Sequence, residues 1–200
     1  TPNPPVGAVI LDAEGHVRGI GCTQPPGGPH AEIEALRMAG KAARRGTAVV
    51  TLEPCNSWGR TGPCSHALAE AGIAALHYAF PDTTSFGGGA HYLEARGVTC
   101  TQFDGTQRAE VRQGGLGAWL HKQETGRPRV TVKMAATLDG FSAAIDGTSQ
   151  WITGEEARAD AHLERARVDA IVVGTGTFAV DNPALTARNP VSYTHLRAHE

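Results

Sequence analysis

The chain has 200 residues, 40% of them hydrophobic, which is enough for one large domain or two small domains with buried cores. Its 18 Lys and Arg residues nearly balance its 20 Asp and Glu residues, and the charges are interspersed, so we expect no polymeric nucleic acid as a partner. No apolar run approaches the length that crosses a bilayer, and Thr1 opens without a basic segment followed by an apolar one, so we expect a cytoplasmic protein with no membrane partner.

The first 125 residues alternate between strand-like and helix-like segments, bounded by Gly and Pro. Apolar periodicity predicts strands over residues 6–11, 17–21, 48–52, 74–80 and 98–103, with the first two paired as a hairpin. It predicts helices over residues 30–40, 65–71 and 90–96. This alternation indicates a layered α/β sheet.

A further helix is predicted over residues 110–122, although three glycines weaken its centre. Linker-like residues follow, and we place a domain boundary near residue 126. Beyond it we expect a strand starting at residues 130–134, an amphipathic helix over 155–167 and a buried strand over 169–173 that leads into a Gly-rich loop at 174–177. The second part is therefore also predicted to be α/β.

One group of residues has the composition of a catalytic metal site: His30, then Cys55, then Cys64 after eight intervening residues. One imidazole and two thiolates would give zinc three protein ligands and leave its fourth position open to water. His30 and Cys64 both fall at predicted helix starts, where the positive end of the helix dipole favours a thiolate. The chain is not Cys-dense, so we expect reduced thiols, and we interpret Cys22 and Cys100 as structural.

Glu32 lies two residues after His30 and is interpreted as the proton carrier. Deamination requires a proton to move from the attacking water to the departing ammonia, and one carboxyl can perform both transfers. Taken singly, each of these residues has a plain structural explanation: a helix cap, buried thiols or a solvated carboxylate. Their order and their places at element boundaries together favour a zinc-dependent deaminase.

Longer motifs extend across almost the whole chain and resemble one family. They are found at residues 2–7, 29–32, 51–55, 59–64, 133–140, 149–153, 174–177 and 181–186. In this combination the chain resembles the bifunctional diaminohydroxyphosphoribosylaminopyrimidine deaminase/5-amino-6-(5-phosphoribosylamino)uracil reductases of riboflavin biosynthesis. The resemblance implies two enzymatic parts, a zinc-dependent hydrolase followed by an NADPH-dependent oxidoreductase.

For residues 1–125, the resemblance implies a deaminase domain with the three-layer sandwich of cytidine deaminases, lacking the family's first helix. Its substrate would be the phosphoribosylated pyrimidine 2,5-diamino-6-(5-phosphoribosylamino)pyrimidin-4(3H)-one. His30, Cys55 and Cys64 match the zinc ligands and Glu32 matches the proton donor. The matching substrate contacts are Asn3, an amide near the base, and Arg60, a cation near the phosphate whose alternative is a solvated loop arginine.

For residues 126–200, the resemblance implies the N-terminal part of a dihydrofolate-reductase-like α/β domain that reduces the ribose of the deaminated product with NADPH. We expect this part to be incomplete, with an atypical tail from about residue 191. Positions matching cofactor contacts are Ala135, Trp151, Thr177 and Asp181, and positions matching substrate contacts are Ser149, Arg165, Leu185 and Arg188.

Two residues depart from the family pattern, because Thr23 and Ser57 stand where histidines are common. Three alternatives stay open at this point. The chain could be another zinc deaminase, acting on a nucleobase, nucleoside or nucleotide. It could be a non-catalytic zinc module, which would need a fourth protein ligand such as Cys22. It could also be a nicotinamide-binding domain alone, although this would leave the His and Cys residues unexplained. Homo-oligomerisation is also open.

Overall fold

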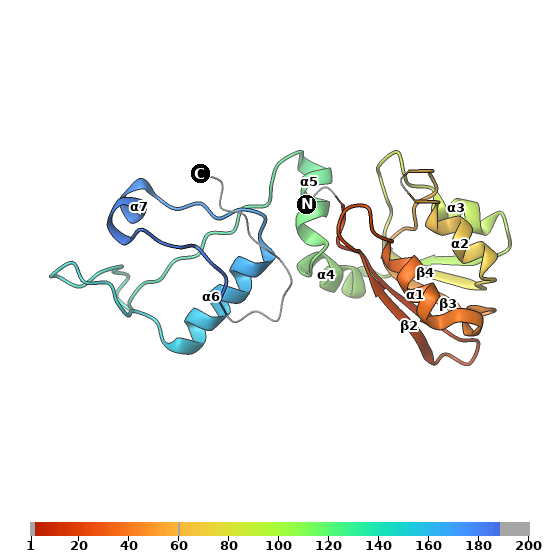
Figure 1. Ribbon diagram of the computed structural model, residues 1–200, viewed down its shortest axis with the longest axis horizontal. Helices are drawn as coiled ribbons and strands as arrows, with labels where there is room; N and C mark the ends of the chain where they lie inside the picture. Colours follow the sequence, from red (N-terminus) through yellow and green to blue (C-terminus); the bar gives the residue numbers. More distant parts are fainter. Residues whose placement is uncertain (1–2, 60, 189–200) are drawn as a thin grey trace. The chain divides into compact units, whose positions relative to one another are not determined.

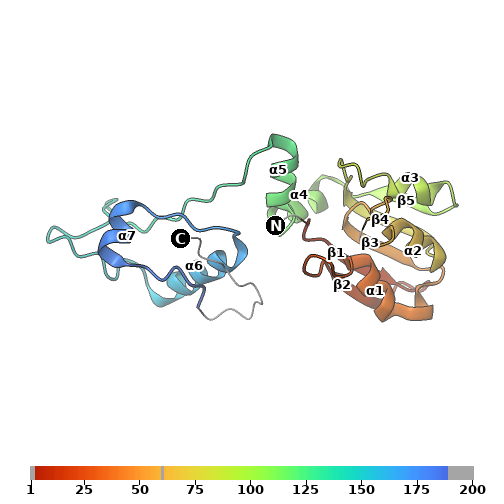
Figure 2. The same ribbon diagram turned by 45° about the horizontal axis from the view of Figure 1, so that its top comes forward.

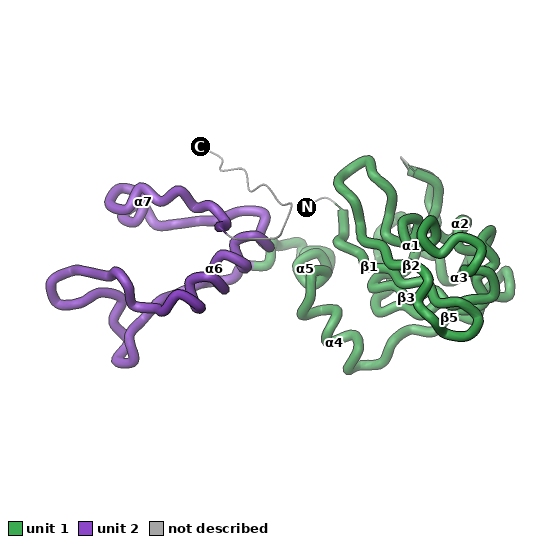
Figure 3. The backbone as a smooth tube through the Cα atoms, turned by 60° about the horizontal axis from the view of Figure 1, so that its bottom comes forward, with its two compact units in different colours: residues 1–129 green, residues 130–200 purple. Residues whose placement is uncertain are grey.

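The computed structural model of the chain describes residues 3–59 and 61–188. Its backbone divides into two compact units, Thr1–Arg129 and Val130–Glu200 (Figure 3). The division falls three residues beyond the boundary that we placed near residue 126.

A five-stranded mixed sheet forms the centre of the first unit (Figure 1). Its spatial order is β2-β1-β3-β4-β5. Strand β1 pairs antiparallel with both β2 and β3, whereas β3, β4 and β5 run parallel. The α/β sheet expected from the sequence is therefore confirmed. The strands are β1 (Gly7–Leu11), β2 (Val17–Cys22), β3 (Thr47–Leu52), β4 (Ala75–Phe80) and β5 (Thr99–Gln102).

Three helices and one 3₁₀ turn connect these strands, and Figure 2 shows the helices against the sheet. Helix α1 (Ala31–Ala39) continues into a 3₁₀ turn (Gly40–Ala43), while α2 (Cys64–Glu70) and α3 (Gly89–Glu94) connect the parallel strands. Alternate strand residues meet small side chains of α1, which lets helix and sheet approach closely. The buried cluster between them contains Ala8, Ile10, Ala31, Ala35, Ala39, Ala43, Ala48, Val50, Leu68, Ile73, Leu76, Ala90, Leu93 and Val98.

The contact between β2 and α1 depends on glycine. A Cβ atom built on Gly21 would lie 2.1 Å from the carbonyl oxygen of Ala31 and 2.7 Å from the backbone nitrogen of Ala35. Both atoms belong to the backbone of α1, so an added methyl group must displace the helix or the strand. Since His30 immediately precedes α1, this contact also helps to fix the start of the candidate metal site.

We expect Gly21→Ala to lower the free energy of unfolding by about 1–3 kcal/mol, the usual result of overpacking a filled interior. Urea denaturation measures the change. Gly105→Ala is the control, because no atom lies within 4 Å of its added Cβ and its φ is not positive. Equal stability of the two variants would contradict this account of the β2–α1 contact.

The prediction of a single helix over residues 110–122 is wrong. The structure has two helices there, α4 (Gly105–Gln113) and α5 (Gly117–Thr125). Gly114 adopts an extended conformation with φ −78° and ψ −159°, which ends α4. A Cβ on Gly117 would lie 1.9 Å from the carbonyl oxygen of Arg112, so the turn requires a residue without a side chain. The glycines that weakened the pattern mark this break.

Helices α4 and α5 are joined by an ion pair and pack on a second apolar cluster. Arg112 donates from both terminal nitrogens to the two carboxylate oxygens of Glu124, at 2.6 and 2.8 Å. This bidentate geometry holds the two helices together. The cluster is separate from the one under α1 and contains Leu52, Ala79, Phe80, Leu116, Trp119 and Leu120.

In the second unit, the helix predicted over residues 155–167 is present as α6 (Glu155–Arg167), but both expected strands are absent. Val130, Val132 and Val172 are 78%, 76% and 91% exposed. A strand needs a neighbour for its hydrogen bonds, and residues 130–188 contain none. The predicted loop at 174–177 is instead the start of α7 (Thr175–Asp181). Leu163 of α6 is 45% exposed.

Among residues 3–59 and 61–188, no helix combines the length and the apolar composition that a membrane span requires.

Candidate metal centre

His30 occupies the residue that caps the N-terminus of α1. Its backbone is extended, with φ −75° and ψ 163°, and its carbonyl oxygen accepts hydrogen bonds from the backbone nitrogens of Ile33 and Glu34. The side chain is half-buried and makes no capping hydrogen bond, so the imidazole is available for other contacts. The sequence correctly placed His30 at a helix start.

Cys55 and Cys64 lie at the two ends of the loop between β3 and α2. Cys55 follows the end of β3 by three residues, and Cys64 is the first residue of α2. The backbone nitrogen of Ser65 donates to the carbonyl oxygen of Cys55 at 3.1 Å, and the backbone nitrogen of Cys64 donates to the Cys55 sulfur at 3.3 Å. These bonds close the loop and bring both sulfur atoms to the start of α2.

The three side chains meet at one point. His30 Nδ1 lies 3.6 Å from the Sγ of Cys55 and 3.3 Å from the Sγ of Cys64, and one ligand atom from each residue lies within 4.8 Å of the others. Among the residues that the structure describes, this is the group of His, Cys, Asp and Glu side chains close enough to hold a metal ion. The fold thus brings His30 to two cysteines that lie 25 and 34 positions further along the chain.

The geometry suits zinc. Zinc bonds of about 2.3 Å to sulfur and about 2.0–2.1 Å to nitrogen, at tetrahedral angles, would separate the two kinds of atom by roughly 3.5 Å. The observed separations of 3.3 and 3.6 Å lie on either side of that value. One nitrogen and two sulfur donors also match the ligand preference of zinc, and a fourth position would be left for a small molecule.

Hydrogen bonds among the three candidate ligands shift the pKa values of the two cysteines in opposite directions. The Cys64 thiol donates to the Cys55 sulfur, which lowers the pKa of Cys55 to about 4, with further help from His30 and the Cys64 backbone nitrogen. The same thiol–thiolate bond raises the pKa of Cys64. The hydrogen bond to Cys55 raises the pKa of His30. A thiolate is therefore already favoured at Cys55, and metal binding would release the remaining proton from Cys64.

Glu32 lies beside the three candidate ligands but is not one of them. It is the second residue of α1, is only 4% exposed, and interacts electrostatically with His30 and Cys55. Burial raises its pKa to about 7, because the charged carboxylate is poorly solvated there. A carboxyl group with such a pKa is populated in both protonation states near neutral pH, as a proton carrier requires.

A side-chain pair that we did not predict from the sequence braces the same loop. The fully buried hydroxyl of Ser65 donates to the side-chain oxygen of Asn56 at 2.8 Å. Asn56 also donates its backbone N–H to the carbonyl oxygen of Phe86 at 2.8 Å. Asn56 follows Cys55 and Ser65 follows Cys64. Their positions next to the candidate ligands could have identified this pair from the sequence.

The other cysteines lie outside the cluster. Cys22 is exposed, and its sulfur accepts a hydrogen bond from Gln24. Cys100 is half-buried, and its thiol donates to the carbonyl oxygen of Ala90 at 3.5 Å. Neither belongs to the group near His30, so within the described residues Cys22 does not supply a fourth ligand.

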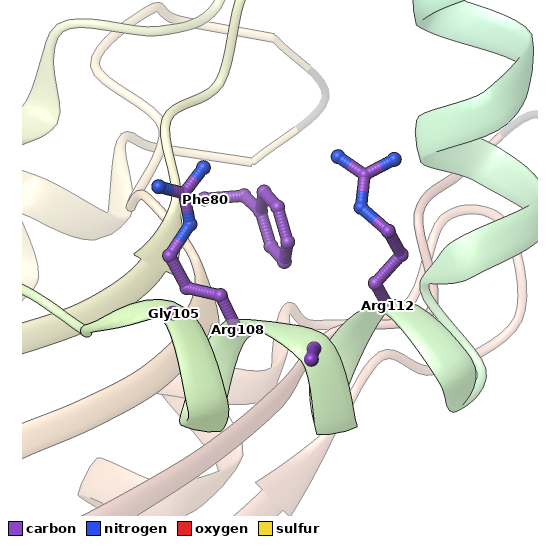
Figure 4. A pocket seen from close by; sticks show the side chains of 5 residues that line it. Phe80, Gly105, Arg108 and Arg112 are labelled. Carbon is purple, nitrogen blue, oxygen red and sulfur yellow. The ribbon is translucent and has the colours of Figure 1, made fainter.

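A cavity of about 240 Å³ lies elsewhere in the first unit (Figure 4). The guanidinium groups of Arg108 and Arg112 lie 4.9 and 5.1 Å from the centre of the Phe80 ring, and Figure 4 shows them flanking it. None of the predicted site residues lines this cavity. Cation–π contacts give these arginines a packing role, holding α4 against the end of β4.

Of the remaining first-unit residues predicted to bind substrate, Asn3 is half-buried and Arg60 lies outside the described residues. In the second unit, the segment from Leu185 to Arg188 lies against α6. Arg165 donates to the carbonyl oxygen of Thr186 at 3.3 Å, and the backbone nitrogen of Arg188 donates to His162 at 3.1 Å. The predicted substrate positions Arg165, Leu185 and Arg188 are thereby brought to one region.

The predicted cofactor positions are more dispersed along the second unit. Ala135 is half-buried, and Trp151 is 72% exposed with the Arg158 guanidinium 4.4 Å from its ring centre. Thr177 and Asp181, on α7, are exposed, as is Ser149. The described contacts do not join these side chains into one cluster.

Two family models match the chain. Residues 1–80 match the cytidine and deoxycytidylate deaminase zinc-binding region, and residues 128–197 match the RibD C-terminal domain. The first match contains His30, Glu32, Cys55 and Cys64. The second covers nearly all of the second unit.

Known proteins resemble the chain over most of its length. It is 53% identical over 188 residues to the riboflavin biosynthesis protein RibD of Mycobacterium tuberculosis H37Rv, covering 94% of this chain and 55% of the relative. It is 43% identical over 189 residues to RibD of Escherichia coli K12, covering 94% and 50%. The chain thus spans about half the length of these relatives.

A solved structure agrees with the sequence matches. The crystal structure of a diaminohydroxyphosphoribosylaminopyrimidine deaminase/5-amino-6-(5-phosphoribosylamino)uracil reductase from Thermotoga maritima superposes with a TM-score of 0.86 at 36% identity, covering 94% of this chain and 54% of that one. RibD of Acinetobacter baumannii superposes with a TM-score of 0.82 at 38% identity, covering 94% and 52%.

Proposed function

Because the chain belongs to the RibD family of riboflavin biosynthesis proteins, we propose that its first unit is a zinc-dependent deaminase acting on 2,5-diamino-6-(5-phosphoribosylamino)pyrimidin-4(3H)-one. The observation that carries this proposal is the convergence of His30, Cys55 and Cys64 beside the buried carboxyl of Glu32. Three donors suited to zinc, with a proton carrier next to them, are the parts that hydrolytic deamination needs.

His30, Cys55 and Cys64 would hold the zinc ion. When bound, zinc lowers the pKa of a water molecule and so supplies the nucleophile of the reaction. The protein provides the other contributions. The starts of α1 and α2 fix two of the three ligands, and the burial of Cys64 and Glu32 limits the access of bulk water to the proton carrier.

Glu32 would move the protons. Its carboxylate takes a proton from the attacking water and gives it to the ring nitrogen next to the amino-bearing carbon. It then takes the second proton of that water and gives it to the 2-amino group, which leaves as ammonia while the carbon–oxygen double bond forms. In the zinc-free protein burial raises the pKa of Glu32 to about 7, so this carboxyl group accepts a proton more readily than a solvated one does. Asn3 and Arg60 are proposed to contact the base and the phosphate of the substrate.

We further propose that the second unit is part of an NADPH-dependent reductase that acts on the deaminated product. The match of residues 128–197 to the RibD C-terminal domain supports this assignment and disfavours a deaminase of another pathway. The proposed NADPH contacts are Ala135, Trp151, Thr177 and Asp181, and the proposed substrate contacts are Ser149, Arg165, Leu185 and Arg188. A cytoplasmic location belongs to the same proposal.

The test combines metal analysis with an ammonia assay on the purified chain. We expect about one zinc ion per chain and release of ammonia from the phosphoribosylated diaminopyrimidine, with little release from cytidine, deoxycytidylate or adenosine. Zinc without turnover of the diaminopyrimidine, or faster turnover of a nucleoside, would contradict the proposed substrate. Absence of bound zinc after loading would contradict the metal site.

A further inference from the structure

We propose that Glu53 is a positioning residue for the metal centre, because its buried carboxylate fixes the backbone that carries Cys55. The inference rests on the proposed zinc site and adds a residue that does not touch the metal. Glu53 follows the end of β3, and only Pro54 separates it from Cys55. Its effect on the centre would therefore be transmitted through one residue of backbone.

Both carboxylate oxygens of Glu53 accept hydrogen bonds from backbone groups far away in the sequence. Oε2 accepts from the backbone nitrogen of Asp82 at 3.0 Å, and Oε1 accepts from that of Ala90 at 2.9 Å. Glu53 is 9% exposed. A buried carboxylate is tolerated only when such bonds replace its hydration, so these two contacts are what allow an acid at this position.

The bond to Ala90 also completes α3. The residue that caps this helix is Gly88, which has no side chain to accept from the free N–H groups of the first turn. Glu53 supplies that acceptor from another part of the chain, and a negative charge is favourable at this end of a helix. A Cβ on Gly89 would lie 1.9 Å from the carbonyl oxygen of Pro54, so α3 begins directly against the residue that precedes Cys55.

The three candidate ligands consequently have different anchors. His30 is set by α1 and Cys64 by α2, whereas the segment leading into Cys55 is held to the loop after β4 and to α3 through Glu53. Metal sites require their donors to be placed within about 0.5 Å of the productive geometry. Loss of one Glu53 acceptor would leave a buried N–H unpaired and loosen the segment that places the Cys55 sulfur.

Asp12 offers a matched control at the other end of the sheet. Its carboxyl group is 6% exposed and also accepts from two backbone nitrogens, because Oδ1 accepts from Glu14 at 3.1 Å and from His16 at 2.8 Å. Its other oxygen, Oδ2, accepts from the Arg18 side chain at 2.6 Å. Because Leu11 pairs with Thr47, Asp12 lies where β3 begins, whereas Glu53 lies where β3 ends. The six residues of β3 separate them by roughly 20 Å.

The experiment compares Glu53→Gln with Asp12→Asn in the 200-residue chain. Glu53→Gln replaces one carboxylate oxygen by an NH₂ group that faces a backbone donor, and Asp12→Asn removes the charge that pairs with Arg18, so both variants should have lower thermal midpoints. Zinc affinity, measured by competition with a chromophoric chelator, should weaken by about 10–100-fold in Glu53→Gln, as is usual when a residue that orients a metal ligand is lost. It should be unchanged in Asp12→Asn.

Cobalt loading gives a second readout that a purely structural role would not change. Thiolate-to-cobalt charge-transfer absorbance reports on the sulfur ligands, and it should fall or shift in Glu53→Gln but not in Asp12→Asn. Zinc binding by Glu53→Gln as tight as that of the unsubstituted chain would overturn the inference alone. Equal weakening in both variants would also overturn it, because the effect would then follow general stability. Absence of zinc from the unsubstituted chain would overturn the proposed function itself.

If Glu53→Gln fails to fold, Ala90→Pro tests the same contact from the donor side. Proline lacks the N–H that Glu53 accepts, yet it is tolerated in the first turn of a helix. The carboxylate and its bond to Asp82 remain, so zinc affinity should fall in the same direction. Unchanged affinity in this variant would contradict the role of Glu53.

Discussion

Glu32→Gln is expected to lower the rate of ammonia release by about 10²–10⁴-fold, the usual contribution of a general acid–base group, while zinc content stays that of the unsubstituted chain. The amide preserves the size of the side chain but cannot carry the proton from the water to the leaving amine. Zinc should be retained because Glu32 lies outside the group formed by His30, Cys55 and Cys64. Parallel measurements of bound zinc and of ammonia release separate the two effects.

Glu34→Gln is the control for this prediction. Glu34 also lies in the first turn of α1, but its side chain is 33% exposed and pairs with Arg37 at 2.7 Å. The substitution removes the same charge from the same helix end, and turnover should be nearly unchanged. Substantial turnover by zinc-loaded Glu32→Gln would remove Glu32 from its proposed role.

Glu32→Gln should also change how the free energy of unfolding of the zinc-free protein depends on pH. Burial raises the pKa of Glu32 from 4.5 to about 7, so the folded state holds this proton more tightly than the unfolded state does. The resulting stability is complete below pH about 4.5 and is lost as the pH rises through about 7. Denaturation of zinc-free protein should therefore show that the variant, which has no charge to bury, gains stability relative to the unsubstituted chain over this range.

Cys64→Ser is expected to abolish stoichiometric zinc binding and, with it, deamination. Serine preserves the shape of this fully buried side chain, but a hydroxyl is a poor zinc ligand compared with a thiolate. Only His30 and Cys55 would remain, and two ligands do not retain the ion against a chelator. Zinc content after dialysis and ammonia release should both fall to near background.

Cys22→Ser tests whether the zinc site is catalytic, with three protein ligands, or structural, with a fourth. Cys22 is exposed and lies outside the ligand group, so this variant should keep its zinc and its activity. Loss of zinc from Cys22→Ser would instead indicate a fourth protein ligand and a closed, non-catalytic site. Full zinc content in Cys64→Ser would show that the sulfur at position 64 is not a ligand.

The sequence by itself determined the local features of the first unit. Apolar alternation identified its five strands, and the positions of His30 and Cys64 at helix starts followed from the boundaries of the flanking segments. The four residues of the proposed site were also predictable, because their chemistry is specific and their order and spacing are readable along the chain. Local patterns of this kind do not depend on where distant residues lie.

Other features were decided only by the tertiary structure. The burial that raises the pKa of Glu32 comes from packing around α1, and the partners of Glu53 lie 29 and 37 residues away, so no local pattern contains them. The apolar runs at residues 130–134 and 169–173 predicted strands, yet neither is one in the structure. A segment becomes a β-strand only when its backbone hydrogen-bonds to a neighbouring strand. Whether such a neighbour is present depends on how the whole chain folds, and the sequence of the segment does not contain that information.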